Sequence, residues 1–266
     1  MTGIAEKTET SRVMHFAANM TGRDFAVGDI HGHFTRLQVA LDALGFDPAV
    51  DRLFSVGDLI DRGPESQDVD EWLLRRPWFH AVRGNHEQMA IDSHAAGRTS
   101  DQCSLHFING GGWFYTLSNA EQDYYTSIFS NLPLVIEVET AQGMIGIVHA
   151  DVPHVSWGDM TEALAETAMP AGHVVAMLQW SRKRLTDGDC TAVDGVRAVI
   201  VGHTPLRQPV VLGNVYHIDT AGWLDGHFTL LNLSTLQCIP PINPEHGFNE
   251  KEKPLGLHPR KGIFDQ

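Results

Sequence analysis

Residues 53–63 read LFSVGDLIDRG, a short apolar run that stops abruptly at a glycine and gives way to charged residues. Similar runs occur at 25–27, 79–82, 145–148, 198–201 and 215–218. Runs this short and this rich in Val and Ile are typical of strands buried in a sheet. The sequence therefore predicts six short strands spread along the chain.

The clearest helical pattern lies between the first two of these runs. Leu37, Ala40, Leu41 and Leu44 recur on one helical face, and Gly45 follows in the position of a C-terminal stop. Strands that alternate with helices predict an α/β fold. In such a fold, polar residues just past the strand ends can converge from separate loops on one crevice.

The domain organisation expected from length and composition is simple. With 266 residues, 42% of them hydrophobic, the chain is long enough for one catalytic domain with a sizeable core. We expect an N-terminal extension at 1–22, the catalytic domain at 23–238 and an irregular tail at 239–266. Within the domain, residues from about 91 to 131 lack a strand pattern and contain NGGGW at 109–113, which predicts a helical insert with a flexible loop over the site.

Composition also bounds the compartment and the partners. The formal net charge of −14 argues against nucleic acid and anionic membranes, because clustered Lys and Arg recruit both. Neither a signal peptide nor a run of roughly 20 apolar residues is present. The three cysteines, Cys103, Cys190 and Cys238, are widely separated and odd in number, which fits a reducing compartment. We therefore expect a cytoplasmic protein whose anionic substrate would need a local positive site.

Chemically distinctive motifs accompany the predicted strands. They read GDIHG at 28–32, GDLIDRG at 57–63, RGNHE at 83–87, HAD at 149–151 and GHTP at 202–205. Together they supply carboxylates, imidazoles and an amide, a mixture that suits a pair of divalent transition ions, whereas Mg²⁺ and Ca²⁺ favour oxygen alone. Asp29 and His31 are alternate residues leaving a strand, so an extended backbone would point both to the same side.

In this order, the motifs resemble those of the phosphoprotein phosphatase family of calcineurin-like metallophosphoesterases, especially its bacterial and phage-type serine/threonine enzymes. The likeness spans about 25–223, and NGG at 109–111 and WSR at 180–182 also match the bacterial branch. The resemblance implies a central two-layer β-sandwich flanked by α-helices, with a dinuclear metal site at one end of the strands. It implies hydrolysis of a phosphomonoester by a metal-bridging hydroxide, with Mn²⁺ as the expected metal and Fe or Zn²⁺ as alternatives.

The resemblance also implies a role for each matching residue. Six residues would hold the ions: Asp29 and His31 the first, Asp58 both, and Asn85, His149 and His203 the second. His86, oriented by Asp61, would protonate the departing alkoxide, a contribution of about 10²–10⁴-fold. Three arginines would grip the phosphoryl oxygens: Arg62, Arg83 and Arg182.

Other polar residues have plainer interpretations. Glu87 is expected to act as an acidic residue at a helix start rather than as a ligand. Histidines outside the motifs are expected at the surface or in packing, and they include His33, His80, His94, His106, His154 and His217.

Several functions stay open. The preferred substrates are phosphoserine and phosphothreonine in proteins, with phosphotyrosine or small phosphoesters as further choices. A symmetrical bis(5′-nucleosyl)-tetraphosphatase has similar metal motifs, although Asp61 and Glu87 favour the phosphatase. A nuclease of the wider group is disfavoured by the acidic charge. A catalytically inactive, metal-stabilised interaction module would lack a ligand or the acid, and every motif position is filled.

Overall fold

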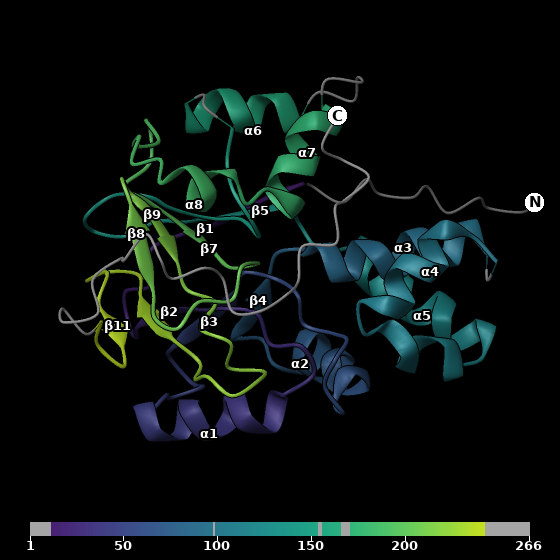
Figure 1. The fold of residues 1–266 in the computed structure, drawn as a ribbon. Coiled ribbons are helices and arrows are strands. Elements are labelled where there is room, and N and C mark those ends of the chain that lie inside the picture. The colour runs from purple at the N-terminus through teal and green to yellow at the C-terminus, as the bar shows by residue number, and fades with distance from the viewer. Residues whose placement is uncertain (1–11, 98, 154–155, 166–170, 243–266) are drawn as a thin grey trace, which may run out of the picture.

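The computed structural model describes residues 12–97, 99–153, 156–165 and 171–242, and its strands form two sheets (Figure 1). The six-stranded sheet has the order β1 (Val13–Phe16), β5 (Val135–Val138), β6 (Ile145–Ile147), β7 (Ala198–Val201), β9 (Val215–His217), β8 (Val210–Leu212). The five-stranded sheet has the order β11 (Cys238–Ile239), β10 (Leu230–Asn232), β2 (Asp24–Val27), β3 (Arg52–Ser55), β4 (Phe79–Ala81).

An apolar layer joins the two sheets face to face. Ala26 and Phe54 of the five-stranded sheet pack in one buried cluster with Ile147 and Ile200 of the six-stranded sheet. Removing such side chains from water stabilises the fold by about 25 cal/mol per Å² of apolar surface. This confirms the predicted two-layer β-sandwich.

Helices cover the outer faces of the sandwich (Figure 1). The five-stranded sheet shares a buried apolar cluster with α1 (Phe34–Leu44) and α2 (Val69–Arg75), and this cluster extends to α3 (Asn85–Ala96) and α5 (Asn119–Ser130), which lie to one side. The six-stranded sheet packs against α6 (Trp157–Ala165) and α7 (Ala171–Trp180). Three short elements complete the chain: η1 (Ser66–Asp68) before α2, α8 (Lys183–Asp187) after α7, and η2 (Gly111–Thr116), which follows α4 (Asp101–Ile108).

The predicted helix forms as α1, and its apolar face packs against the core. Leu37 and Leu41 of α1 are buried, and Ala40 and Leu44 pack against the same core. Gly45 ends the helix in the left-handed conformation, with φ 65°, and its N–H donates to Asp42 O at 3.0 Å. A residue without a Cβ adopts this conformation at no steric cost.

The six predicted strands are confirmed as β2, β3, β4, β6, β7 and β9. The helical insert expected over about 91–131 is confirmed as well, since this range holds the C-terminal part of α3 followed by α4, η2 and α5. Strands β1, β5, β8, β10 and β11 were not predicted. Their apolar runs are interrupted or very short, as in β5, where Glu137 divides the apolar residues.

The expected N-terminal extension and the expected C-terminal tail both contain residues of a strand. β1 falls within the expected extension at 1–22 and pairs in parallel with β5, with Val13 opposite Val135. Ile239, the first residue of the expected tail, belongs to β11, and 243–266 lie outside the described residues. Within the described ranges, no helix is long and apolar enough to cross a membrane.

Candidate active site

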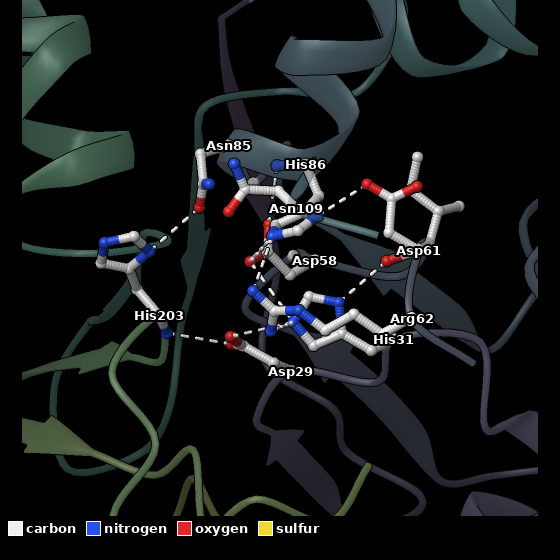
Figure 2. A network of polar contacts seen from close by, with 12 residues as sticks. Asp29, His31, Asp58, Asp61, Arg62, Asn85, His86, Asn109 and His203 are labelled. Carbon is white, nitrogen blue, oxygen red and sulfur yellow. Dashed lines mark hydrogen bonds and ion pairs between the residues drawn. The ribbon is translucent and has the colours of Figure 1, made fainter. Parts of the chain in front are cut away.

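The motif residues lie past the carboxyl ends of parallel strands. β2, β3 and β4 run parallel and lead to Asp29, Asp58 and Asn85. β6 and β7 also run parallel and lead to His149 and His203. The two sheets therefore bring their polar residues together at one end of the sandwich (Figure 2).

Unusual backbone conformations concentrate at this end. A residue with a side chain costs about 1–3 kcal/mol in the left-handed region, and such residues persist only where the surroundings enforce them. Those at the site are His31 (φ 45°), Asp58 (φ 51°), Asp61 (φ 73°), Arg62 (φ 63°) and His203 (φ 67°). The fold thus holds the site in a shape that isolated loops would not adopt.

Two glycines let the backbone approach the carboxylates closely. A Cβ at Gly84 would lie 2.2 Å from Asp58 Oδ1, and a Cβ at Gly202 would lie 2.3 Å from Asp29 Oδ1. No side chain could be accommodated at either position without moving the carboxylate. The two motif glycines therefore cradle the two acids.

One group of side chains has the spacing of ligands around a single ion. His149 Nε2 lies 2.8 Å from Asn85 Oδ1, 3.2 Å from His203 Nδ1 and 3.4 Å from Asp58 Oδ2. Two ligand atoms bound at about 2.1 Å and at right angles would be about 3.0 Å apart. His149 Nδ1 donates to Val56 O at 2.8 Å, which directs the lone pair of Nε2 into the group. These residues fit a metal ion.

A second group shares Asp58 with the first. His31 Nε2 lies 3.7 Å from Asp58 Oδ2 and 3.9 Å from Asp29 Oδ2. His31 Nδ1 donates to Ile60 O at 2.8 Å, so its Nε2 also presents a lone pair to the acids. His86 Nε2 lies 3.8 Å from Asp58 Oδ2 and belongs to this group by distance. Asp58 is therefore placed between two potential ion sites.

The electrostatics of both groups favour a bound cation. Burial, followed by the charges of Asp219 and Asp58, raises the pKa of Asp29 well above its usual value. A buried acid in this state lacks compensating positive charge. Burial, followed by the nearby arginines, holds the pKa of His31 and that of His203 well below the usual value. Both imidazoles are therefore neutral at pH 7, the form that binds metal.

Asp58 and His149 stabilise each other's charged forms. Burial by itself would raise the pKa of Asp58, but His149 and His86 outweigh it and hold that pKa well below its usual range. Burial would lower the pKa of His149, but the Asp58 carboxylate outweighs it and raises that pKa. A cation shared by the two groups would take over this compensation.

The three predicted phosphate-binding arginines occupy different surroundings. Arg62 points into the site, with Nη1 2.5 Å from His31 Nε2 and Nη2 3.0 Å from His86 Nε2 (Figure 2). Its guanidinium lies 4.5 Å over the ring of Trp223. Thus Arg62 contacts the Nε2 atoms of two site histidines.

Arg182 and Arg83 differ in the charges that act on them. Burial lowers the pKa of Arg182, and the charges of Asp58, Arg62 and Asp29, which belong to the site, also act on it. Burial lowers the pKa of Arg83 too, but there the charges of Glu87, Arg12 and Asp92 act on it instead. The charges that act on Arg83 thus come from outside the two metal groups.

The predicted acid and its partner form a close pair. His86 Nδ1 donates to Asp61 Oδ2 at 2.6 Å, and this contact leaves Nε2 facing the site (Figure 2). Burial would raise the pKa of Asp61, but hydrogen bonds from His106 and His86 hold it below its usual range. Asp61 is therefore an ionised acceptor.

Glu87 has the structural position expected for it. Its carboxylate accepts from the backbone N–H groups of Gly84 at 2.8 Å, Leu59 at 2.8 Å and Asp58 at 3.1 Å. Burial, followed by the charge of Asp58, raises its pKa to about 7. Glu87 ties the start of α3 to the loop that carries Asp58.

Sequence reasoning missed several residues at the site. His106, expected at the surface or in packing, is buried against Asp61, and Trp113 Nε1 donates to Asp61 Oδ1 at 2.7 Å. Asp219 is buried near Asp29, and burial raises its pKa to about 6. Asp219 directly follows the predicted strand at 215–218, so its position could have identified it, whereas no local pattern links His106 to Asp61.

Three further histidines outside the motifs, His33, His94 and His217, have other surroundings in the described part of the chain. His33 Nδ1 donates to His31 O at 2.6 Å, and His94 pairs with Asp123 at 2.7 Å. His217 is buried, and burial lowers its pKa to about 3. His154 lies outside the described residues.

Comparison with known proteins gives a consistent picture. The family model of the calcineurin-like phosphoesterases matches residues 25–207. Serine/threonine-protein phosphatase 1 of Salmonella typhimurium is 38% identical over 212 residues, which make up 79% of this chain and 91% of that protein. Serine/threonine-protein phosphatase 2 of Escherichia coli is 34% identical over 79% of this chain and 92% of its own length.

Similarity to the rival enzyme class is more restricted in sequence. A symmetrical bis(5′-nucleosyl)-tetraphosphatase of Pseudomonas putida is 47% identical, but over 64 residues, 24% of this chain and 22% of that protein. A solved structure assigned to a diadenosine tetraphosphatase matches with a TM-score of 0.58 over 85% of this chain and 95% of its own. At 20% sequence identity, that likeness shows a shared fold.

Proposed function

The chain belongs to the calcineurin-like phosphoesterase family, and we propose that it is a metal-dependent serine/threonine protein phosphatase. Membership makes it a hydrolase of phosphoester bonds. Our choice of phosphoserine and phosphothreonine is supported by two relatives that bear this name and align over 91% and 92% of their length. The tetraphosphatase likeness, which covers 24% of this chain in the Pseudomonas putida enzyme and 58% in a second such enzyme, supports the alternative less.

One observation carries the proposal: two groups of potential ligands share Asp58, beside the Asp61–His86 pair. A carboxylate in this position would be shared by two ions, which together can activate a water molecule. We assign the ions to Asp29, His31, Asp58, Asn85, His149 and His203. The mixed nitrogen and oxygen donors suit Mn²⁺, our first choice, as well as Fe and Zn²⁺.

When bound, divalent ions lower the pKa of a coordinated water and so supply the nucleophile. Arg62 would bind the phosphoryl oxygens, since its planar fork suits two parallel hydrogen bonds. We assign Arg182 the same role, since the charges of Asp58 and Asp29 act on it. Arg83 is the weakest of the three assignments, because the charges that act on it come from Glu87, Arg12 and Asp92.

His86 acts as the general acid. As the bond between phosphorus and the leaving oxygen breaks, the electron pair stays on that oxygen and the Nε2 proton of His86 moves to it. Asp61, 2.6 Å from Nδ1, stabilises the imidazolium before the transfer. General acid catalysis of this kind contributes about 10²–10⁴-fold.

The distance of 3.8 Å from His86 Nε2 to Asp58 Oδ2 raises one alternative, that His86 is a metal ligand. His86→Asn separates the two roles. We expect turnover of a phosphoserine peptide to fall by about 10²–10⁴-fold while the metal content of the purified protein is unchanged. Loss of metal in this variant would move His86 into the ligand set.

The proposed function is tested by steady-state hydrolysis with metal-stripped protein that is reconstituted with Mn²⁺. The substrates are a phosphoserine peptide, para-nitrophenyl phosphate and a dinucleoside tetraphosphate, and Asp58→Asn is the control. Mn²⁺-dependent release of phosphate from the peptide, abolished in the control, is the expected result. Cleavage of the dinucleotide alone would assign the tetraphosphatase activity, and no cleavage of any substrate would favour an inactive interaction module.

A further inference from the structure

The carboxylate of Asp61 accepts hydrogen bonds on both of its oxygens. Oδ2 accepts from His86 Nδ1 at 2.6 Å and from His106 Nε2 at 3.1 Å, and Oδ1 accepts from Trp113 Nε1 at 2.7 Å. Asp61 is fully buried. An ionised carboxylate has about four acceptor sites, so three side-chain donors on a buried group fix the plane of its oxygens.

Two of the three donors come from the helical insert. His106 lies in α4 and Trp113 in η2, whereas Asp61 follows β3 and His86 begins α3. The insert therefore reaches back to the loop that carries the proposed acid's partner. Without it, Asp61 would keep His86 as its one side-chain donor among the described residues.

The insert is itself built to hold these donors in place. His106 Nδ1 lies 3.1 Å from the Tyr115 hydroxyl and 3.3 Å from Ser93 Oγ. A Cβ at Gly111 would lie 2.2 Å from His106 Nε2, so only glycine leaves room for the ring. The orientation of His106 is thus determined by packing and by hydrogen bonds on both ring nitrogens.

The turn that carries Asp61 needs such support. Asp61 and Arg62 have φ 73° and 63°, a conformation that costs about 1–3 kcal/mol for each residue. Arg62 N donates to Gly110 O at 3.2 Å, so the insert also binds the backbone of this turn. The backbone and the carboxylate are held by the same segment.

We propose that His106 and Trp113 are positioning residues that hold Asp61, and through it His86, in the geometry for protonating the leaving group. This inference rests on the proposed function. Residues 101–116 of the insert therefore contribute to proton transfer. Neither residue touches the substrate in this account; each acts through the carboxylate.

The choice of substrate separates positioning from general structural support. A phosphoserine leaves as an alkoxide, which must be protonated as the bond breaks, whereas para-nitrophenolate is a stable anion that leaves without a proton. A displaced His86 therefore slows the peptide much more than the nitrophenyl ester. Damage to the metal groups or to the fold slows both substrates by the same factor.

The experiment measures kcat for both substrates with Trp113→Phe, which removes one N–H donor and keeps an aromatic ring. We expect a 10- to 100-fold loss on the phosphoserine peptide and a much smaller loss on para-nitrophenyl phosphate, because a misplaced acid forfeits part of its contribution. The metal content should equal that of the wild-type protein. Equal losses on both substrates, or loss of metal, would overturn the proposal.

Matched variants separate the loss of a hydrogen bond from a change in side-chain packing. Trp157→Phe removes an indole hydrogen bond to Glu137 Oε1, 2.6 Å long and outside the site, and should not change the ratio of the two activities. His106→Gln keeps a donor near the position of Nε2 and should retain more peptide activity than His106→Leu. Equal peptide activity in the two His106 variants would argue against a hydrogen-bonding role.

A double variant supplies an independent readout. If Trp113 acts only through His86, then Trp113→Phe should cause no further loss on the peptide in a His86→Asn background. The same factor of loss in both backgrounds would contradict the proposal. If the wild-type protein hydrolyses neither phosphoester, the proposed function fails; if it hydrolyses both and only the substrate ratio stays constant, the positioning role alone fails.

Discussion

At the scale of single residues, the site depends on positions where a side chain is absent or a backbone is forced. Asp58 has φ 51°, and Gly84 passes so close that a Cβ would lie 2.2 Å from its Oδ1. Gly202 stands in the same relation to Asp29. Each acid is oriented by a glycine from another strand end, so the glycines of the motifs belong to the site as much as the acids do.

Gly202→Ala tests this dependence. Its Cβ would lie 2.3 Å from Asp29 Oδ1 and 2.5 Å from Val56 Cγ2, so Asp29 must move. We expect Mn²⁺ affinity to fall by about tenfold or more, as for other losses of ligand orientation, measured by titrating the metal-stripped protein. Gly172→Ala in α7, where a Cβ meets nothing within 4 Å, is the control. An unchanged Mn²⁺ affinity in Gly202→Ala would contradict the role of Gly202 in positioning Asp29.

At the scale of elements, the strands and the insert supply different parts of the site. The potential ligands follow strands β2, β3, β4, β6 and β7, and the donors that hold Asp61 lie in α4 and η2.

Strand β4 also carries His80, whose ring lies 4.4 Å from the ring of Phe16 and 5.3 Å from the ring of Phe54. His80 links β4 to the strand β1 through aromatic packing.

His80 makes stability depend on pH. Burial, followed by the charge of Arg52, lowers its pKa to about 4, below the unfolded value near 6.5. The unfolded chain therefore takes up a proton first, so stability is full above pH 6.5 and falls as pH drops toward 4. Between pH 6.5 and pH 4, we expect the free energy of unfolding to fall by roughly 1–3 kcal/mol less in His80→Leu than in the wild-type protein. Urea unfolding at several pH values measures this difference.

The control for His80 is the exposed His173 in α7, replaced by Leu. His173→Leu should leave the slope of stability against pH as it is in the wild-type protein. An unaltered slope in His80→Leu would show that His80 does not titrate in this range.

At the scale of the whole molecule, two sheets bury acids that only a bound cation would compensate fully. Asp29, Asp58 and Asp219 are all buried at the end of the sandwich, and burial raises the pKa of Asp29 and of Asp219. Like charges this deep repel one another unless protons or metal ions intervene. Stability of the whole fold should therefore depend on metal.

Metal removal tests this dependence. We expect the unfolding temperature to fall on chelation and to rise again with Mn²⁺, with about 2.7 kcal/mol regained at a free metal concentration 100 times Kd. In Asp58→Asn the response to chelation should be much smaller, because one shared acid is gone. A thermal unfolding curve that is the same with and without metal would contradict this account.

The sequence by itself determined the strand–helix alternation and the set of motif residues that gather at one end, whereas the two-layer sandwich was implied by the family resemblance. These features are local: a short apolar run predicts a buried strand, and the polar residues that follow the run must lie at the end of that strand. The same logic would have identified Asp219 after the run at 215–218. It failed for β5, where Glu137 interrupts the run.

Only the tertiary structure decided which side chains meet across long separations. His106 and Trp113 reach Asp61 from 45 and 52 residues away, and β1 pairs with β5, more than a hundred residues later. Of the three motif arginines, Arg62 points at the site histidines, while the charges acting on Arg83 belong to other residues. Such contacts depend on how helices and sheets pack in space, and local patterns carry no record of that packing.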